Sequence, residues 1–337
     1  MEGCLIVKVA LVYNDVELDR ARVELENPHA IEQLLMTISA MEDALVKKGH
    51  EVSHVVLPRY PSVDAIIRDR SDVYFNLTTG MLDKRMQLHA VAILEMAGVP
   101  FVGSGLIAHG VALDKYLAKV LLQRSGVNTP SFQLIPERGE WKPEPDMIYP
   151  AIIKPCREGS SLGITSDSVV YSASEAAKRG EQLREQFRQN MLLEELATGR
   201  EFTAGVLGND PVRIFPIQEI LYGDWPEGEA EIYSFDAKVN EWAARACPAD
   251  LIEAEVAEIE RMCREGMKVL GLRDLARLDI RIDRRGAPSL LEVNALPGLQ
   301  PLYSEYPRMA EAGGLSYVDL IDELVQLGVD HYPSWGP

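Results

Sequence analysis

The sequence predicts an α/β protein that begins with an open sheet of the parallel type. Apolar runs of strand length alternate with stretches whose apolar residues recur at helical spacing. Helices are expected over Ile31–Leu45 and Met86–Ala97, and each is closely followed by a glycine. Strands and helices that alternate in this way are typical of an α/β fold. The expected strands of this sheet are Leu5–Tyr13, Val52–Leu57, Asp72–Leu77 and Val99–Val102.

Length and composition restrict the class of protein. The chain has 337 residues, 47% of them hydrophobic, which predicts a globular protein of two or three domains. Its net charge of −18 argues against broad binding to nucleic acid or to anionic membranes. The apolar run near the N-terminus contains Lys8 and is too short to cross a membrane. No signal-peptide cleavage site follows it, so we expect a cytoplasmic protein.

The cysteines are expected to be free thiols. No C-x-x-C pair occurs, and a disulfide framework is not expected in a cytoplasmic chain. The histidines are scattered without metal-ligand spacing, so a zinc site is not expected. The four cysteines are Cys4, Cys156, Cys247 and Cys263.

The same patterns predict further elements in the rest of the chain. Helices are expected over Lys115–Ser125 with Asp114 as N-cap, from Ser172 to about Gln189, from Asp250 to Leu270, and from Ser316 to Leu327. Strands are expected over Ile148–Lys154, Met191–Leu196, Val206–Ile220 and Glu231–Phe235. A loop-rich connection is expected at Asn128–Pro145, and a mobile loop is expected at Tyr222–Glu229 and again at Asp236–Asn240.

The segment Arg277–Gly298 is expected to form two strands joined by a turn. Apolar and polar residues alternate in both halves, so the polar side chains can share one face when the strands pair. Oxygen ligands of this kind favour Mg²⁺, and an arginine beside them suits a developing negative charge on a phosphoryl or carbonyl oxygen. A surface hairpin with solvated charges is the alternative. The polar residues are Arg277, Asp279, Glu292 and Asn294.

A flexible loop directly follows a lysine at a strand end. The segment Arg157–Gly163 contains two glycines and two serines, whose N–H and O–H groups suit a phosphate. Lys154 adds a mobile cation beside it, which favours phosphate binding over an ordinary hairpin loop. Gly103-Ser104-Gly105 lacks the spacing of a dinucleotide-binding loop, and the chain has no P-loop motif. The strand that ends in Glu194 and Glu195 could bind a ribose or an adenine amino group, although exposed glutamates are usually solvated.

In this order the motifs resemble the ATP-grasp superfamily, and within it the D-alanine–D-alanine ligases. The resemblance spans about residues 103–304 and implies an ATP-grasp fold of the α/β class with three domains. These are an open α/β N-terminal substrate domain over 1–114, a central lid over 115–201, and a C-terminal α+β domain for ATP and Mg²⁺ over 202–337. The matching runs are Val102-Gly103-Ser104-Gly105, Leu113-Asp114-Lys115, Ile153-Lys154-Pro155 with Arg157–Gly163, Leu193-Glu194-Glu195 with Gly199–Thr203, Ala237-Lys238, Arg277–Asp279, and Leu291–Asn294 with Pro297-Gly298.

The resemblance implies that ATP lies between the lid and the C-terminal domain. The residues that match phosphate-binding lysines are Lys115, Lys154 and Lys238. Those that match the loop over the γ-phosphate are Ser160 and Ser161. The adenine-contacting hinge is matched by Glu194, Glu195 and Leu196, and the ribose-binding glutamate by Glu201. Two Mg²⁺ ions, for which Mn²⁺ can substitute, would be held by Asp279, Glu292 and Asn294.

The resemblance further implies which residues act on the substrates. Arg277 and the N–H of Gly298 would stabilise the tetrahedral oxyanion. Ser304 would receive the carboxylate of the second substrate, although it comes one residue later than is usual. Ser160 and Lys238 would complete the catalytic group around the γ-phosphate.

Two departures from the family pattern concern the substrates. Family members carry an S-x-E-[RH]-E-type segment after the first strand, whose glutamate holds the amino group of the first D-alanine. In its place Asn14–Asn27 offers Glu17, Asp19 or Glu24. Val239 stands where a tyrosine often follows the loop lysine.

The expected activity is ATP-dependent ligation of a carboxylate to an amine through an acyl phosphate. The product would be a dipeptide such as D-alanyl-D-alanine, a peptidoglycan precursor. One alternative is a ligase that joins another amino acid to a small carboxylate, as the similar mycosporine ligases do. The other is an ATP-binding module without turnover. Small-molecule amino acids are the expected partners, with neither nucleic acid nor membrane, and the resemblance implies a homodimer.

Overall fold

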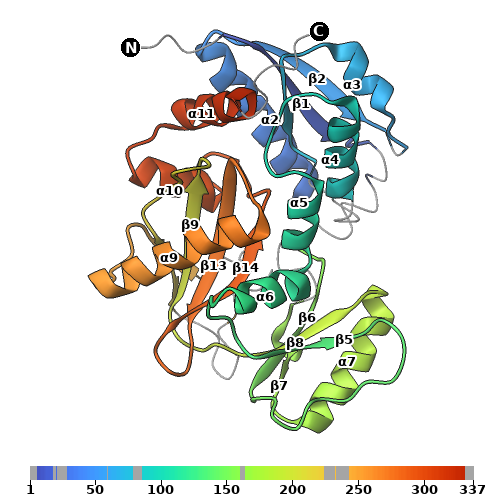
Figure 1. The fold of residues 1–337 in the computed structure, drawn as a ribbon, viewed down its shortest axis with the longest axis vertical. Helices are drawn as coiled ribbons and strands as arrows, with labels where there is room; N and C mark the ends of the chain where they lie inside the picture. The colour runs from blue at the N-terminus through green and yellow to red at the C-terminus, as the bar shows by residue number, and fades with distance from the viewer. Residues whose placement is uncertain are drawn as a thin grey trace.

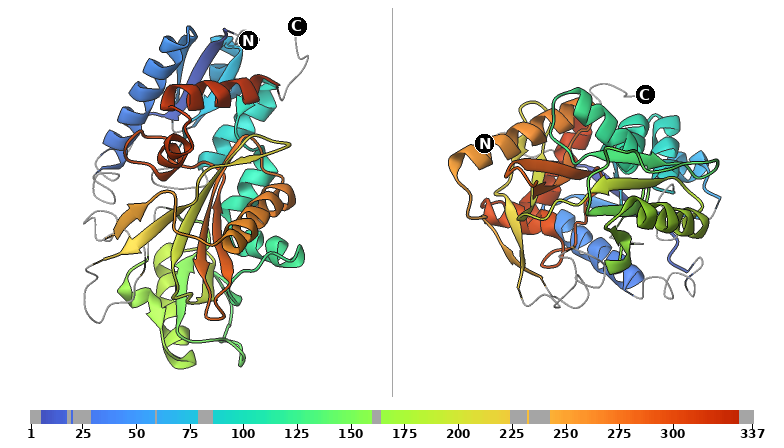
Figure 2. Two further views of the ribbon diagram at one scale, coloured as in Figure 1. Left: turned by 90° about the vertical axis from the view of Figure 1, so that its left-hand side faces the viewer. Right: turned by 90° about the horizontal axis from the view of Figure 1, so that it is seen from below.

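The computed structural model describes residues 6–17, 20, 29–58, 60–78, 86–159, 164–223, 232 and 243–330. These residues form three sheets, two of four strands and one of six. The sheet formed by the last strands of the chain lies between the other two (Figures 1 and 2). Segments from all parts of the sequence therefore meet around this central sheet.

The first sheet is parallel, as the sequence predicts for this part of the chain. Successive side chains of a strand point to opposite faces, so Val9 and Leu11 pack on one side while Ala10 and Val12 pack on the other. Both faces are buried along residues 9–12 and 73–76, which explains why these two stretches are almost entirely apolar. In sheet order the strands are β2 (Glu51–Leu57), β1 (Lys8–Asn14), β3 (Val73–Asn76) and β4 (Phe101–Val102).

Helices cover both faces of this sheet. One face packs against α2 (Ala30–Lys47) and against α11 (Tyr317–Asp330), the last helix of the chain. The other packs against α3 (Val63–Asp69) and α4 (Met86–Ala97). Contact between α11 and α2 joins the two ends of the chain in one core (Figure 1). Local sequence patterns do not predict this long-range packing.

The second sheet is antiparallel and carries one helix, α7 (Ala173–Phe187), on one face. The predicted start of this helix is confirmed, because the Ser172 hydroxyl accepts a hydrogen bond from the Glu175 N–H at 3.3 Å. The Glu175 carboxylate in turn accepts one from the Tyr171 N–H at 2.9 Å. In sheet order the strands are β5 (Phe132–Ile135), β8 (Met191–Glu195), β6 (Ala151–Pro155) and β7 (Val169–Val170).

The third sheet is the central one, and its two faces differ in chemistry. The apolar face carries Phe202 and Leu278 and is covered by α5 (Leu106–Leu113), α6 (Lys115–Arg124) and α9 (Glu253–Leu270). The opposite face carries polar residues, and α10 (Glu305–Ala312) packs near one end of it against β9. In sheet order the strands are β12 (Ala243–Ala246), β11 (Gln218–Tyr222), β9 (Glu201–Leu207), β13 (Leu275–Ile282) and β14 (Pro288–Asn294), with β10 (Arg213–Ile214) paired to β9.

Two helices pack against a different sheet from the one that the predicted domain limits at residues 114 and 201 assign to them. Helix α6, which begins at Lys115, packs on the third sheet through Ala118 and Leu122 rather than on the second. Helix α11, near the end of the chain, packs on the first sheet beside α2. The limits 1–114, 115–201 and 202–337 stay a prediction.

Three predictions of local structure are wrong. The run Val206–Ile220 is divided among β9, β10 and β11, because the turn-forming residues 208–212 interrupt it. The long helix α9 begins at Glu253 and not at an Asp250 cap, because the Glu255 carboxylate accepts a hydrogen bond from the Ile252 N–H at 3.1 Å. The predicted loop 128–145 contains β5. Most of the strand and loop predicted between residues 222 and 240 lies outside the described residues.

Two expectations from composition can be compared with the described residues. Cys156, Cys247 and Cys263 are free thiols there, and Cys4 lies outside the described ranges. Within those ranges no helix has both the length and the apolar character that a membrane crossing requires.

Buried His109 on α5 is expected to make the fold sensitive to acid. Its Nε2 atom lies 3.0 Å from Gln87 Oε1, and burial lowers its pKa to about 4 from the usual 6.5. The unfolded chain therefore binds a proton first as the pH falls. The stability from the neutral ring is complete above about pH 6.5 and is lost between about pH 6.5 and 4.

The variant His109→Gln tests this expectation by urea unfolding at pH 7 and pH 5. In the parent protein this histidine should account for roughly 2 kcal/mol of the stability lost between these two pH values. The variant should lose less by about that amount. An identical loss in both proteins would show that His109 does not carry the effect.

Candidate active site

The polar face of the β13–β14 hairpin gathers four charged or polar side chains. Arg277 lies opposite Asn294 and Asp279 lies opposite Glu292, after a one-residue register shift between Asp279 and Ile280. Arg277 donates two hydrogen bonds to Asp279, from Nε at 2.9 Å and from Nη2 at 2.7 Å. The Asn294 amide donates to Asp279 at 3.1 Å and, more weakly, to Glu292 at 3.4 Å. This register brings the four polar side chains into one compact cluster, although apolar residues separate them along each strand.

Cations balance the two opposed carboxylates. Facing carboxylates on neighbouring strands repel each other unless positive charge lies nearby. Lys115 Nζ lies 3.2 Å from Glu292 Oε2, and Arg277 pairs with Asp279. Burial alone would lower the pKa of Arg277, but Asp279 and Glu292 outweigh it and raise that pKa. The Thr203 hydroxyl donates a further hydrogen bond to Asp279 at 2.8 Å.

Helix α6 begins where it can deliver Lys115 to this cluster. The Asp114 carboxylate accepts hydrogen bonds from the N–H groups of Tyr116 and Leu117, so the predicted N-cap is confirmed. Lys115 is the first helical residue, and its ammonium also donates to the Glu158 carbonyl at 2.5 Å. Lys115 therefore joins the loop after β6 to Glu292 on β14.

A cavity of about 100 Å³ opens between the second and third sheets. Apolar side chains such as Ile152, Leu196 and Leu291 form part of its wall, which suits a flat aromatic ring beside a charged tail. A larger hollow of about 370 Å³ lies between the 213–217 segment and α9, and its lining contains none of the predicted site residues. The charged residues that line the smaller cavity are Lys115, Lys154, Glu158, Glu194, Glu195, Glu201, Asp279, Arg281 and Glu292.

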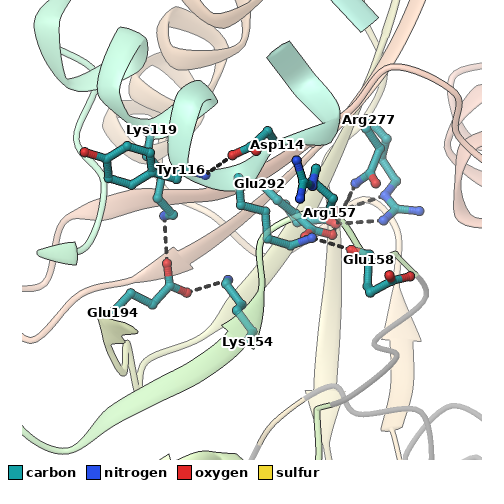
Figure 3. A network of polar contacts seen from close by, with 12 residues as sticks. Asp114, Tyr116, Lys119, Lys154, Arg157, Glu158, Glu194, Arg277 and Glu292 are labelled. Atoms are coloured by element: carbon teal, nitrogen blue, oxygen red, sulfur yellow. Dashed lines mark hydrogen bonds and ion pairs between the residues drawn. The ribbon is translucent and has the colours of Figure 1, made fainter. Parts of the chain in front are cut away.

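Glu194 on β8 lies between two buried lysines (Figure 3). Its Oε1 is 2.5 Å from Lys154 Nζ, and its Oε2 is 2.9 Å from Lys119 Nζ. Burial would raise the pKa of this carboxyl group, but Lys119 and Lys154 lower it below the usual value. Burial would likewise lower the pKa of Lys154, and Glu194 with Glu292 raises it instead. The carboxylate and Lys154 are therefore held in their charged forms.

Glu201, at the start of β9, is held by two neighbours. Its carboxylate accepts a hydrogen bond from the Tyr222 hydroxyl at 2.5 Å and lies 3.6 Å from Arg281 Nη1. Arg281 also donates to the Gly199 carbonyl at 2.9 Å. These contacts place the Glu201 carboxylate at the cavity wall.

The loop after the hairpin brings Gly298 against Ser304. A Cβ atom on Gly298 would lie 2.7 Å from the Ser304 hydroxyl oxygen, so only glycine allows this approach without a shift. The Ser304 hydroxyl accepts a hydrogen bond from the Gln300 N–H at 3.2 Å, which leaves its own hydrogen free to donate. Ser304 directly precedes α10, whose first residue Glu305 accepts hydrogen bonds from Gln218 and Arg245.

Comparison with known proteins identifies the family. A family model described as the D-ala D-ala ligase C-terminus matches residues 121–326. The chain belongs to the D-alanine–D-alanine ligase family. This is a family of ATP-dependent ligases, so the predictions of an enzyme and of an ATP-grasp resemblance are confirmed.

Relatives and a solved structure extend this family assignment. The protein y4sG of Sinorhizobium fredii is 32% identical over 86% of this chain and 84% of its own length. The D-alanine–D-alanine ligase of an Arthrobacter species is 32% identical over 77% of this chain and 68% of its own. In fold the chain is similar to the Bacillus anthracis D-alanine–D-alanine ligase complexed with ATP, with a TM-score of 0.75 and 20% identity over 96% and 98% of the two chains. The predicted ATP-grasp fold class is confirmed by this similarity.

The structure brings together most of the residues that the ligase resemblance singled out. Those that line the cavity are Lys115, Lys154, Glu194, Glu195, Leu196, Glu201, Asp279 and Glu292. Arg277 and Asn294 join the same hairpin face, and Gly298 and Ser304 meet at the start of α10. Ser160, Ser161 and Lys238 lie outside the described residues. Glu17 is described, but it is exposed and pairs with Arg20 at 2.7 Å rather than lining the cavity.

Three residues at or beside this candidate site were missed by the sequence reasoning. Lys119 follows Lys115 by four residues, so both lie on one side of α6, and this spacing could have revealed it. Thr203 shares a strand face with Glu201, and Arg281 shares one with Arg277 and Asp279, by the same alternation. Extending each predicted motif by two residues along a strand, or by four residues along a helix, would have found all three.

Proposed function

We propose that this ligase joins the carboxylate of one small substrate to the amine of another at the cost of ATP, through an acyl phosphate. The observation that carries the proposal is the cavity in which Lys115 and Lys154 meet Asp279 and Glu292. It combines cations for phosphates with an oxygen ligand set for Mg²⁺, as phosphoryl transfer requires. The polar contacts of Arg277, beside this cavity, support a carbonyl as the second reacting group.

The nucleotide is proposed to lie across the cavity. Glu194, Glu195 and Leu196 would contact the adenine and Glu201 the ribose. The phosphates would extend toward Lys115 and Lys154, with Lys238, Ser160 and Ser161 closing over them. The 2.5 Å hydrogen bond from Tyr222 supports the role of Glu201, because it orients the carboxylate at the cavity wall.

The metal site is proposed at Asp279, Glu292 and Asn294, for two Mg²⁺ ions or for Mn²⁺ in their place. In the described part of the chain no three His, Cys, Asp or Glu side chains form a metal-type cluster, so the amide oxygen of Asn294 is proposed as a ligand beside the two carboxylates. The amide nitrogen faces the carboxylates in this structure, and a turn of the amide would present the oxygen. The bound metal would neutralise charge on the reacting phosphate.

Residues of the chain then handle the two bond-forming steps. The first substrate's carboxylate bonds to the γ-phosphorus as ADP leaves, and Lys154 with Lys115 would stabilise the phosphate charge. The second substrate's amine attacks the acyl carbonyl, phosphate leaves, and the amine proton passes to solvent. Arg277 and the Gly298 N–H would bind the oxyanion, and the Ser304 hydroxyl would donate to the second substrate's carboxylate. A closed lid would exclude water from the acyl phosphate.

We propose that the preferred substrates differ from the two D-alanine molecules that form D-alanyl-D-alanine. Glu17 offers a carboxylate after β1, but its side chain is 68% exposed and bound to Arg20. Loss of one charge-assisted contact costs roughly 1.5–3 kcal/mol, or about one to two decades in rate. We therefore expect D-alanine to be a poor first substrate unless Glu17, Asp19 or Glu24 supplies the contact. This favours the alternative of an amino acid joined to another small carboxylate, as in mycosporine ligases.

The test is a panel of D- and L-amino acids and small carboxylates with Mg-ATP. Phosphate release is measured for each pair, and the product mass is confirmed. We expect a pair other than two D-alanines to react fastest. If D-alanine alone gives alanyl-alanine far faster than every other pair, the proposed departure is wrong and the peptidoglycan role is favoured. No phosphate release with any pair would favour an ATP-binding module without turnover.

The assembly and location of the enzyme are proposed from the family resemblance. We propose a cytoplasmic homodimer with small-molecule partners only. Exposed apolar side chains on neighbouring helices, Met96 on α4 and Ile107 on α5, are 76% and 83% accessible and would suit a subunit contact. Light scattering after gel filtration measures the subunit number directly.

A further inference from the structure

Three charged side chains are buried together behind the nucleotide cavity. Lys119, Lys154 and Glu194 keep 1%, 7% and 3% of their side-chain surface exposed. They come from α6, β6 and β8, so the cluster joins a helix on the third sheet to two strands of the second (Figure 3). Burial of three charges is costly unless each has a partner. The arrangement therefore needs a functional or structural reason.

Lys119 is anchored away from the cavity. Its ammonium donates to the Thr129 hydroxyl at 2.8 Å and to the Leu290 carbonyl at 3.3 Å. Its 2.9 Å contact with Glu194 Oε2 is an ion pair, because within the described residues that oxygen accepts no well-directed hydrogen bond. Lys154 and Glu194 line the cavity, whereas Lys119 is not among the described residues that line it. Lys119 thus touches Glu194 from behind.

The two lysines have different freedom to move toward a ligand. Lys154 faces the cavity and forms a 2.5 Å contact with Glu194 Oε1, which it must weaken to serve a phosphate. Without another cation, that movement would leave a buried carboxylate without compensation, which is strongly unfavourable. Lys119 supplies the second cation at 2.9 Å and has no access to the cavity itself. It can therefore stay with Glu194 while Lys154 turns to the nucleotide.

We infer that Lys119 is a positioning residue for nucleotide binding, which compensates Glu194 and so releases Lys154 for the phosphates. The inference rests on the proposed function, because it takes the cavity as the ATP site. It adds a role for a lysine that touches neither the nucleotide nor the metal. Burial lowers the pKa of Lys119 to about 8 although Glu194 raises it, so the ammonium is still mostly protonated at pH 7.

The first experiment compares the parent protein with Lys119→Met. Methionine keeps an unbranched side chain of nearly the same length but removes its charge, so Glu194 is left with Lys154 alone. We expect the dissociation constant of a non-hydrolysable ATP analogue with Mg²⁺ to rise by about 10- to 100-fold in calorimetry. The KM of the amino-acid substrates should stay within about twofold. Lys178→Met, the same change at an exposed position on α7, should alter neither quantity.

A double-mutant cycle separates positioning from a structural role. Glu194→Gln removes the charge that Lys119 compensates, so adding Lys119→Met to it should change nucleotide affinity by less than about threefold. A lysine needed only for packing would lose the same affinity in both backgrounds, and that result overturns the inference. If Lys119→Met alone does not fold, the comparison of Glu194→Gln with the double variant still decides, because a further tenfold loss contradicts the inference.

Failure of this inference can be told apart from failure of the proposed function. If the parent protein binds the ATP analogue and Lys119→Met binds it equally well, the positioning role is wrong and the proposed ligase function is not contradicted. If the parent protein binds no adenine nucleotide, both fall together.

Discussion

Replacing Glu292 with glutamine is expected to reduce ATP-dependent ligation by about 1,000-fold. The change removes one of two negative oxygen ligands proposed for the metal and leaves Lys115, 3.2 Å away, without its charged partner. Charge neutralisation by a metal is worth several kcal/mol in phosphoryl transfer, which corresponds to a loss of this size. Phosphate release at saturating substrates and over a range of Mg²⁺ concentrations measures it.

The control for this variant is Glu185→Gln, which makes the same chemical change at an exposed position on α7. It should keep full activity. Glutamine preserves the shape of residue 292, so the unfolding midpoint in urea should change little. Parent-like turnover in Glu292→Gln would exclude this glutamate as a metal ligand.

Replacing Arg277 with methionine should lower kcat by about 100- to 1,000-fold while nucleotide binding is kept. Arg277 is proposed to stabilise the oxyanion of the second step, and loss of one such donor typically costs this much. Its two hydrogen bonds to Asp279 hold the guanidinium in place, so the fixed orientation is part of the expected effect. The rate of ligation and the dissociation constant of the ATP analogue are measured on the same preparation.

The variant Arg277→Lys adds a test of geometry. Lysine keeps the charge but cannot form the paired hydrogen bonds with Asp279, so it should recover only a small part of the lost rate. If Arg277→Met weakens nucleotide binding as much as it lowers kcat, Arg277 acts on the metal or the fold and not on the oxyanion.

Local patterns predicted the two strands of the β13–β14 hairpin and the polar side chains that they carry. Alternation of polar and apolar residues fixes which side chains of each strand share a face. The pairing of Asp279 with Glu292 also needs a one-residue register shift between Asp279 and Ile280, which the sequence pattern did not predict. The N-cap at Asp114 was predictable, since its carboxylate serves the next N–H groups in the chain. The shared strand faces and the N-cap both depend on neighbours in sequence.

Features that depend on distant partners were not predictable from local patterns. The spacing of four residues places Lys119 on the same side of α6 as Lys115, but only the tertiary contact with Glu194 shows that it is buried. The packing of α11 on α2 likewise depends on segments nearly 300 residues apart. The prediction of a single strand over residues 206–220 was wrong for a different reason. The turn-forming residues that interrupt it were present in the sequence, but the prediction relied on the apolar content of the segment.

The acyl-phosphate route itself is tested most directly by oxygen transfer. The first substrate is labelled with ¹⁸O in both carboxylate oxygens, and the inorganic phosphate released during ligation is analysed by mass spectrometry. If the carboxylate attacks the γ-phosphorus, one labelled oxygen stays on that phosphorus when the amine displaces it. The account predicts one ¹⁸O atom in each phosphate released per product formed. Unlabelled phosphate in the presence of normal product formation would contradict it.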